Sequence, residues 1–170
     1  GLEFIEAKWL FNCDPSDIDV VIHPQSIIHS MVQYHDGSIL AQMGNPDMRT
    51  PIAHALAYPE RINAGVKPLN FSDISDFSFT KPDFSRYPNL QLAIDACSAG
   101  QGATTTVNAA NEIAVSAFLN GEIGFTDIYT INAQTLEAAT YTNVQSLDEI
   151  LECDRLARLS ASQFITKVTH

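Results

Sequence analysis

The chain has 170 residues, and its hydrophobic fraction of 45% and charged fraction of 17% are typical of a folded globular protein and argue against disorder as its main state. Twenty acidic and nine basic residues give a formal net charge of −11, which repels phosphate backbones and anionic lipid headgroups, so nucleic acid and membrane surfaces are not expected partners. The sequence also lacks an apolar run of the roughly 18–20 residues that a membrane-spanning helix needs.

Cysteine usage indicates a reducing compartment. Cys13, Cys97 and Cys153 are odd in number, widely spaced and free of any C-x-x-C pattern. We interpret them as reduced thiols and expect neither a disulfide framework nor a zinc site. Together with the missing secretion signal, this predicts a cytoplasmic protein.

A helix is predicted at the start of the chain. Leu2, Ile5, Trp9 and Leu10 follow the i, i+3, i+4 spacing of a helical stripe. The helix should end before Asp14-Pro15, because the residue that precedes a proline avoids helical backbone angles.

A β-hairpin is predicted over residues 27–43. Asp36-Gly37 between β-rich flanks is typical of a two-residue type I′ turn. This turn would pair Tyr34 with Ile39, Val32 with Ala41 and Ser30 with Met43 on one mostly apolar face. The other face, which should meet a cleft, a partner or solvent, would carry His29, Met31, Gln33, Leu40 and Gln42.

A short helix and an irregular segment should follow the hairpin. Thr50-Pro51 has the form of an N-cap with proline at the first helical position, and the helix should stop at Tyr58-Pro59. Residues 60–88 are broken by prolines and predict an irregular connector. The expected apolar anchors of this connector are Phe71, Phe77, Phe79 and Phe84.

Four amphipathic helices are predicted in the second half, which has no proline after Pro88. Residues 90–99 and 105–120 each precede a glycine, residues 126–139 have Thr126 as a cap, and a capping box from Ser146 to Glu149 starts the fourth helix. Short loops between such helices favour a small bundle. We therefore predict an α+β fold with a boundary between residues 1–84 and 85–170.

Spacing alone gives few signals for chemistry. Glu3 and Glu6 are neighbours on one helix surface, an arrangement that is usually a solvated face, although a carboxylate can also bind a hard metal ion. His29 lies on the mixed strand face, where it meets a ligand or is a hydrogen-bonded structural histidine. Met48 suits packing against an aromatic ring, but methionine more often fills a core. No histidine pair has the spacing of a helical zinc site.

Other polar residues give no catalytic prediction. Arg49, beside a helix start, either binds a phosphate or pairs with Asp47. Asn108, Asn111 and Glu112 are expected to bond neighbouring loops or caps. No G-x-G-x-x-G, P-loop or G-x-S-x-G motif is present.

Several longer strings resemble the C-terminal half of the 1-deoxy-D-xylulose 5-phosphate reductoisomerase family. They are GLEFIEAKWLF, IHPQSIIHSMVQYHDGSILAQMGNPDMRTPIAHALAYPERI and VNAANEIAVSAFL. The resemblance covers essentially the whole chain and is weaker after about residue 139. It implies an enzyme that converts 1-deoxy-D-xylulose 5-phosphate to 2-C-methyl-D-erythritol 4-phosphate with NADPH and Mg²⁺ or Mn²⁺, on the non-mevalonate route to isoprenoids.

The resemblance also implies an architecture and roles for three residues. Residues 1–84 would be part of a catalytic and dimerising domain plus a connector, and residues 85–170 would be a C-terminal helical domain. Glu3 matches a carboxylate that binds metal and contacts substrate, His29 matches a histidine important near the active site, and Met48 matches a methionine beside the nicotinamide ring. The hairpin matches the region that forms the sheet of a homodimer.

The departures from the family are segments that this sequence lacks. They are the nucleotide-binding domain, the other metal-binding carboxylates, the mobile loop over the substrate, and an Asn-Lys pair before the Gly-Leu-Glu string. We therefore expect this chain alone neither to turn over substrate nor to bind the metal tightly. The alternative interpretation is a stand-alone dimerisation or scaffold module without catalysis.

Overall fold

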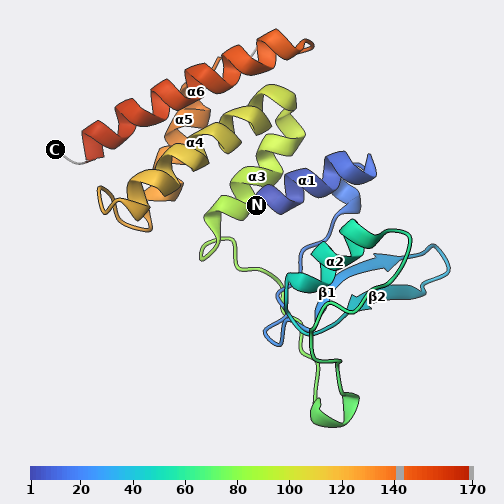
Figure 1. Ribbon diagram of the computed structural model, residues 1–170. Coiled ribbons are helices and arrows are strands. Elements are labelled where there is room, and N and C mark those ends of the chain that lie inside the picture. Colours follow the sequence, from blue (N-terminus) through green and yellow to red (C-terminus); the bar gives the residue numbers. More distant parts are fainter. Residues whose placement is uncertain (141–143, 169–170) are drawn as a thin grey trace. The chain divides into compact units, whose positions relative to one another are not determined.

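The computed structural model describes residues 1–140 and 144–168, and the chain groups into two compact units (Figure 1). The helical unit comprises Gly1–Asp19 and Asp83–His170, and the hairpin unit comprises Val20–Pro82. The described residues form six α-helices and one two-stranded antiparallel sheet, which confirms the α+β class. None of the described helices is both long and apolar enough to cross a membrane.

Helix α1 (Leu2–Phe11) opens the helical unit and packs against α3 (Pro88–Ala99). Its Phe4 is buried, whereas Trp9, Leu10 and Phe11 at its end are exposed. The helix stops at Asn12, whose left-handed φ of 48° closes the last turn, and a 3₁₀ turn at Pro15–Asp17 follows. The predicted end of this helix before Asp14-Pro15 is confirmed.

Four helices form the rest of this unit, as the sequence predicted. Helix α4 (Gln101–Leu119) contacts α3, α5 (Asp127–Ala138) and α6 (Leu147–Val168), and Figure 1 shows it lying among them. Small side chains on α4 let its neighbours approach closely, because the distance between packed helices depends on the side chains at the contact. The buried alanines of α4 are Ala103, Ala109, Ala110, Ala114 and Ala117.

The ends of these helices only partly follow the sequence prediction. Ser146 and Glu149 form the expected capping box: Ser146 Oγ accepts from the Glu149 N–H at 3.3 Å, and Glu149 Oε2 accepts from the Ser146 N–H at 3.0 Å. Thr126 makes no side-chain capping bond at α5. Asp127 Oδ2 instead accepts from the Gly124 N–H at 2.8 Å, a bond that holds the turn before α5.

The inward face of α6 is made of alanines together with Phe164 and Ile165 rather than of leucines. Ala157 and Ala161 are buried against the core, while Leu151, Leu156 and Leu159 are each more than half exposed. Both sets lie at helical spacing, so the hydrophobic pattern alone does not identify the packed side.

The hairpin forms with a register that differs by one residue from the predicted one. Strands β1 (Ile28–Gln33) and β2 (Ile39–Met43) pair Val32 with Leu40 and Gln33 with Ile39, not Val32 with Ala41. The reason is a three-residue loop, since Tyr34 and Ser38 close the hairpin and Gly37 takes the left-handed position at φ 85°. The predicted division of side chains between the two faces is therefore wrong.

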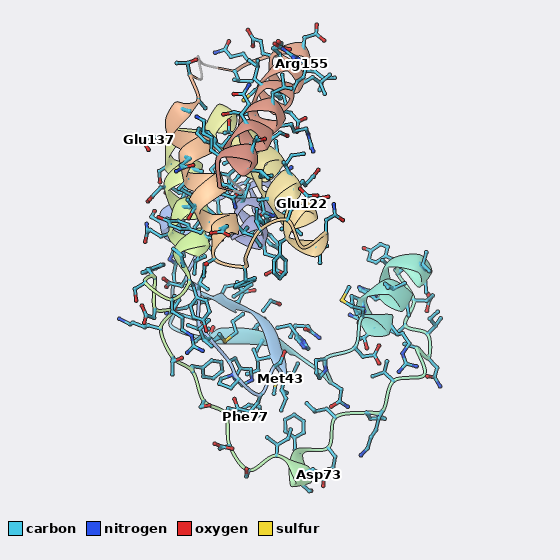
Figure 2. The ribbon with its side chains drawn as sticks, turned by 90° about the vertical axis from the view of Figure 1, so that its left-hand side faces the viewer. Met43, Asp73, Phe77, Glu122, Glu137 and Arg155 are labelled. Atoms are coloured by element: carbon cyan, nitrogen blue, oxygen red, sulfur yellow. The ribbon has the colours of Figure 1, made fainter. Side chains whose placement is uncertain are left out.

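The remaining hairpin unit consists of α2 (Arg49–Ala57) and a long irregular segment with a 3₁₀ turn at Phe71–Asp73. Figure 2 places Asp73 in the turn at the tip of this segment. The helix starts one residue before the predicted cap, because Asp47 rather than Thr50 accepts the first free N–H, that of Arg49 at 2.9 Å. The expected anchors of the segment, Phe71, Phe77, Phe79 and Phe84, are all exposed in this chain.

Candidate functional site

A hollow of about 700 Å³ lies in the hairpin unit, between the strands, the loop after β2 and helix α2. Two of the three site residues predicted from the family resemblance, His29 and Met48, line it. The full lining is His29, Gln42, Gly44, Asn45, Pro46, Asp47, Met48, Thr50, Pro51, His54 and Arg61.

His29 enters this hollow through an irregularity in the sheet. The pairing shifts between Ile28 and Ser30, so His29 is the extra residue of a bulge. Its Nδ1 lies 2.9 Å from Gln42 Oε1, and Gln42 Nε2 donates to the carbonyl oxygen of Met43 at 3.3 Å. Because the amide nitrogen of Gln42 is used by Met43, its oxygen faces the imidazole, and this network assigns the proton of His29 to Nδ1. The Nε2 lone pair is then available to a ligand.

Met48 lies at the start of α2 and is 70% exposed, so its thioether is accessible to a flat ring. The loop that carries it is held by Asp47, which receives bonds from Arg49 Nε at 3.0 Å and from Arg49 Nη2 at 2.6 Å. These side-chain bonds, together with the Arg49 backbone N–H, lower the pKa of the Asp47 carboxyl to about 2. The Asp47 carboxylate therefore stays charged, and able to pair with Arg49, well into the acid range.

His54 and Arg61 also line the hollow, and the sequence analysis gave them no role. His54 Nδ1 is buried without a hydrogen-bond partner, and its ring meets the Tyr58 ring edge-on at 6.0 Å. Arg61 makes no salt bridge with any described residue, in contrast to Arg49. Both residues stand inside the family string quoted above, but nothing in their spacing predicts that they line the same hollow as His29.

Glu3 belongs to the helical unit, where it lies exposed on the first turn of α1. It borders a second hollow, of about 470 Å³, whose other polar lining residues are Glu6, Asn89, Asn111 and Asn132. Glu3 makes no salt bridge with the described part of the chain, so its carboxylate is free to bind a ligand.

The described part of this chain offers a single candidate ligand for a divalent metal ion, the carboxylate of Glu3. Among residues 1–140 and 144–168, no group of three or more His, Cys, Asp or Glu side chains is placed to hold a metal ion. Glu3 has the oxygen donor that Mg²⁺ and Mn²⁺ prefer. A complete site would need further oxygen ligands, so the described residues do not form one by themselves.

Residues 108–112 (NAANE) of α4 bond other helices rather than the loops or caps that we expected. Asn111 Oδ1 accepts from Asn132 Nδ2 at 3.1 Å, and Glu112 pairs with Arg158 Nη2 at 2.8 Å. Arg158 also bonds Asp154, and the two carboxylates raise the pKa of its guanidinium. The segment therefore ties α4 to α5 and α6.

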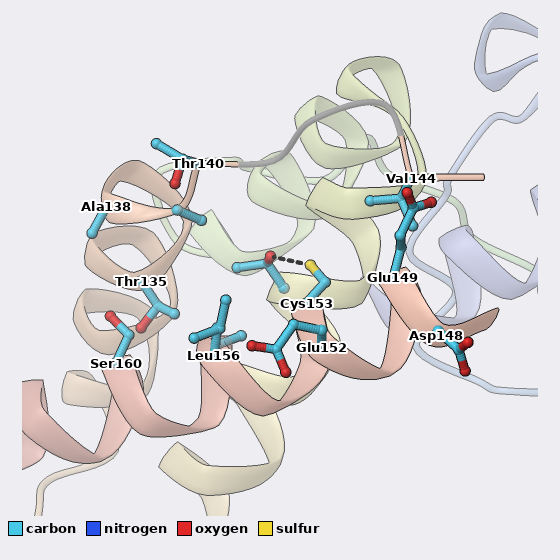
Figure 3. A pocket seen from close by; sticks show the side chains of 13 residues that line it. Thr135, Ala138, Thr140, Val144, Asp148, Glu149, Glu152, Cys153, Leu156 and Ser160 are labelled. Carbon is cyan, nitrogen blue, oxygen red and sulfur yellow. Dashed lines mark hydrogen bonds between the residues drawn. The ribbon is translucent and has the colours of Figure 1, made fainter. Parts of the chain in front are cut away.

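A third hollow, of about 570 Å³, is lined from α4, α5 and α6 (Figure 3). The Cys153 thiol lies on its wall, 3.4 Å from both Thr106 Oγ1 and the Gly102 carbonyl oxygen. All three cysteines are free thiols. None of the residues predicted as site residues lines this hollow.

Comparison with known proteins gives one consistent result. Residues 43–160 match the family described as DXP reductoisomerase C-terminal domain. The chain is 63% identical to 1-deoxy-D-xylulose 5-phosphate reductoisomerase of Shewanella amazonensis and 62% identical to that of Tolumonas auensis, over 168 residues in each case. Both matches cover 99% of this chain but 42% of the relative, so the chain spans less than half the length of these curated relatives.

Solved structures agree with the sequence matches. The reductoisomerase of Zymomonas mobilis in complex with NADPH has a TM-score of 0.86 at 45% identity, covering 96% of this chain and 43% of that one. A reductoisomerase structure with NADPH, fosmidomycin and magnesium has a TM-score of 0.85 at 46% identity, covering 96% of this chain and 42% of that one.

Proposed function

The chain belongs to the 1-deoxy-D-xylulose 5-phosphate reductoisomerase family, and we propose that it is the C-terminal part of an enzyme of that activity. The enzyme would convert 1-deoxy-D-xylulose 5-phosphate to 2-C-methyl-D-erythritol 4-phosphate with NADPH and Mg²⁺ or Mn²⁺, in the isoprenoid pathway of the cytoplasm. The observation that carries this proposal is the 63% identity to a named reductoisomerase over 99% of the chain.

Glu3 is the residue that we assign to the metal and the substrate. Its exposed carboxylate, free of any salt bridge to the described residues, supports this role. A bound divalent ion supplies charge stabilisation to the oxygens of the substrate. Glu3 would contribute one oxygen ligand to that ion, and the others would come from parts of the enzyme outside this chain.

His29 and Met48 would contact the reacting parts of the substrate and the cofactor. The Gln42 bond holds the His29 imidazole in one orientation, which leaves Nε2 to accept or return a substrate proton. Met48 offers an exposed thioether against which a nicotinamide ring can pack. Both side chains line the same hollow of the hairpin unit.

The hairpin would form the homodimer interface. Val32 and Leu40, a facing pair on the two strands, are 55% and 64% exposed, and Met31 and Ile39 on the other face are also exposed. Apolar side chains on both faces of a two-stranded sheet support a covering partner, because such a sheet is marginally stable alone. We assign the catalytic and dimerising role to residues 1–84, including the connector, and the helical-domain role to residues 85–170.

The proposal is tested by joining this chain to the rest of a relative. In the S. amazonensis reductoisomerase, the matching 42% is replaced by this chain, and NADPH oxidation is measured with 1-deoxy-D-xylulose 5-phosphate and Mn²⁺ or Mg²⁺. The chimera should turn over, while this chain alone should not. A chimera that folds and dimerises without activity would instead favour a non-catalytic scaffold module.

A paired substitution tests the assignment of Glu3. Glu3→Gln in the chimera should abolish metal-dependent turnover. Glu6→Gln, one turn further along the same helix surface, is the matched control and should retain it. Equal losses in both variants would contradict the specific role of Glu3.

A further inference from the structure

Three asparagines from three helices meet in the helical unit. Asn132 of α5 donates from Nδ2 to Asn89 Oδ1 of α3 and to Asn111 Oδ1 of α4, both at 3.1 Å. Asn132 is only 1% exposed. A buried side-chain amide with two such bonds holds its neighbours in a defined arrangement, because breaking either bond would leave a polar group unsatisfied away from water.

One polar atom of this cluster has no partner. Asn132 Oδ1 is buried and accepts no hydrogen bond. Rotating the amide by half a turn would exchange the two atoms and leave the nitrogen unpartnered instead. In either orientation Asn132 keeps an unused polar atom, and the residue borders the same hollow as Gly1 and Glu3.

The start of α1 lies directly against this cluster. A Cβ added to Gly1 would lie 2.9 Å from the Asn89 carbonyl oxygen and 3.0 Å from Ala93 Cβ, which is closer than a side chain tolerates. Gly1 then accepts the first two bonds of the helix, from the Phe4 N–H at 3.1 Å and the Ile5 N–H at 3.3 Å. The backbone of Asn89 therefore limits where the first turn of α1 can lie.

We propose that Asn132 is a positioning residue for Glu3. Through its bond to Asn89 it holds the part of α3 against which Gly1 packs, and so directs the Glu3 carboxylate two residues later in the same turn. The link runs from Asn132 to the Asn89 side chain, and from the Asn89 backbone to Gly1. The consequence for metal binding rests on the proposed function of Glu3, whereas the ordering of the turn does not.

Hydrogen exchange in this chain tests the ordering of the turn. Asn132→Leu keeps the branched shape of the side chain but removes both bonds. The Phe4 and Ile5 amides, which bond Gly1, should then exchange about tenfold faster, while amides in the middle of α4 keep their rates. Asn120→Ala is the matched control, because Asn120 is an exposed amide at the other end of α4 that bonds its near neighbour Glu122, and it should change neither set.

Unchanged rates at Phe4 and Ile5 in a folded Asn132→Leu variant would overturn the proposal. If that variant does not fold, Asn89→Ala decides, because it removes one bond of the cluster at a half-buried position. Faster exchange of the two amides in Asn89→Ala supports the proposal, and unchanged exchange refutes it.

The chimera separates positioning from general structural damage. Asn132→Leu should raise the Mn²⁺ concentration needed for half-maximal rate about tenfold, as loss of a partner behind a metal ligand typically does, with the KM for NADPH unchanged. Gly1→Ala, which forces the first turn away from Asn89, should give the same split. A parallel rise in the Mn²⁺ concentration for half-maximal rate and in the KM for NADPH would contradict a positioning role. An inactive parent chimera would refute the proposed function, and the exchange result would still decide the positioning.

Discussion

His29 Nδ1 lies 2.9 Å from Oε1 of Gln42 across the hairpin, and a bulge makes this contact possible. In the regular part of the sheet, Ser30 faces Gln42 and Met31 faces Ala41. Continued without interruption, this register would set His29 opposite Met43, on the face away from Gln42. The bulge adds one residue and turns the imidazole toward the hollow.

The tautomer of His29 depends on this bond. The neutral imidazole should carry its proton on Nδ1, and Gln42→Leu should shift protons to Nε2, because it removes the only acceptor that the described residues give Nδ1. Imidazole nitrogen chemical shifts measure the two forms. Gln33→Leu, an exposed amide on the same hairpin, is the control and should leave the tautomer unchanged. A dominant Nε2–H form in the unaltered chain would contradict the assignment.

The three-residue loop of the hairpin depends on Gly37. Gly37→Ala should destabilise the hairpin unit by about 1–2 kcal/mol, since a side chain disfavours the left-handed backbone. The φ of 85° and the open space around the position leave backbone strain as the only cause. Gly44→Ala, at a glycine of the same unit without positive φ, should have a much smaller effect. Denaturant unfolding followed by NMR signals of the hairpin would show whether the two variants differ.

Two candidate caps predict opposite outcomes. Ser146→Ala should destabilise the helical unit by about 1 kcal/mol, because it removes the acceptor of the Glu149 N–H. Thr126→Ala should have little effect, as Thr126 makes no side-chain capping bond. Thermal unfolding of both variants measures the difference, and a larger loss for Thr126→Ala would show that the caps are wrongly assigned.

Ile131 is the test of the helical core. It is fully buried in the cluster formed with Ala110, Ala114 and Ala161. Ile131→Ala should lower the free energy of unfolding by about 2–5 kcal/mol through lost burial and the cavity left behind. Leu119→Ala, at a side chain that is 75% exposed, should stay within about 0.5 kcal/mol of the original. Similar values for the two variants would mean that α5 does not pack as described.

The Asp47–Arg49 pair predicts a pH dependence in the acid range. The pKa of Asp47 is lowered from 3.8 to about 2, so the pair contributes fully to stability above its ordinary value and loses that contribution as pH falls toward 2. Asp47→Asn should therefore be less stable than the original at neutral pH, and the difference should shrink below pH 3.8 and vanish as pH falls through about 2. Unfolding curves measured across this pH range test the prediction. A stability difference between the two proteins that persists below pH 2 would contradict the assignment.

Local signals predicted most of the elements. The helical bundle, the capping box at Ser146 and the end of α1 follow from residue spacing, proline positions and hydrogen-bonding caps, which act within one or two turns. The hairpin was found for the same reason, because Asp36-Gly37 is a strong local turn signal. Its register was wrong, since a two-residue and a three-residue loop both accommodate these residues.

The candidate site was less predictable than the fold. Glu3, His29 and Met48 were identified through the family resemblance rather than through their spacing. The Asn89–Asn132–Asn111 cluster carried no signal, because its members lie far apart in the sequence. His54 and Arg61 stand inside the family string, but no local pattern predicts that they line the same hollow as His29. The packed face of α6 was not predicted from the sequence, because leucines and alanines both recur along this helix and either set could face the core.

The sequence by itself determined the family, the α+β class and the order of the helices, because these depend on residue identities and on interactions between near neighbours. Only the tertiary structure decided the bulge that turns His29, the alanine face of α6 and the amide cluster beneath Glu3. These features arise where segments that are distant along the chain pack closely and pair their hydrogen-bonding groups. No local stretch of sequence specifies which distant segment will be the partner.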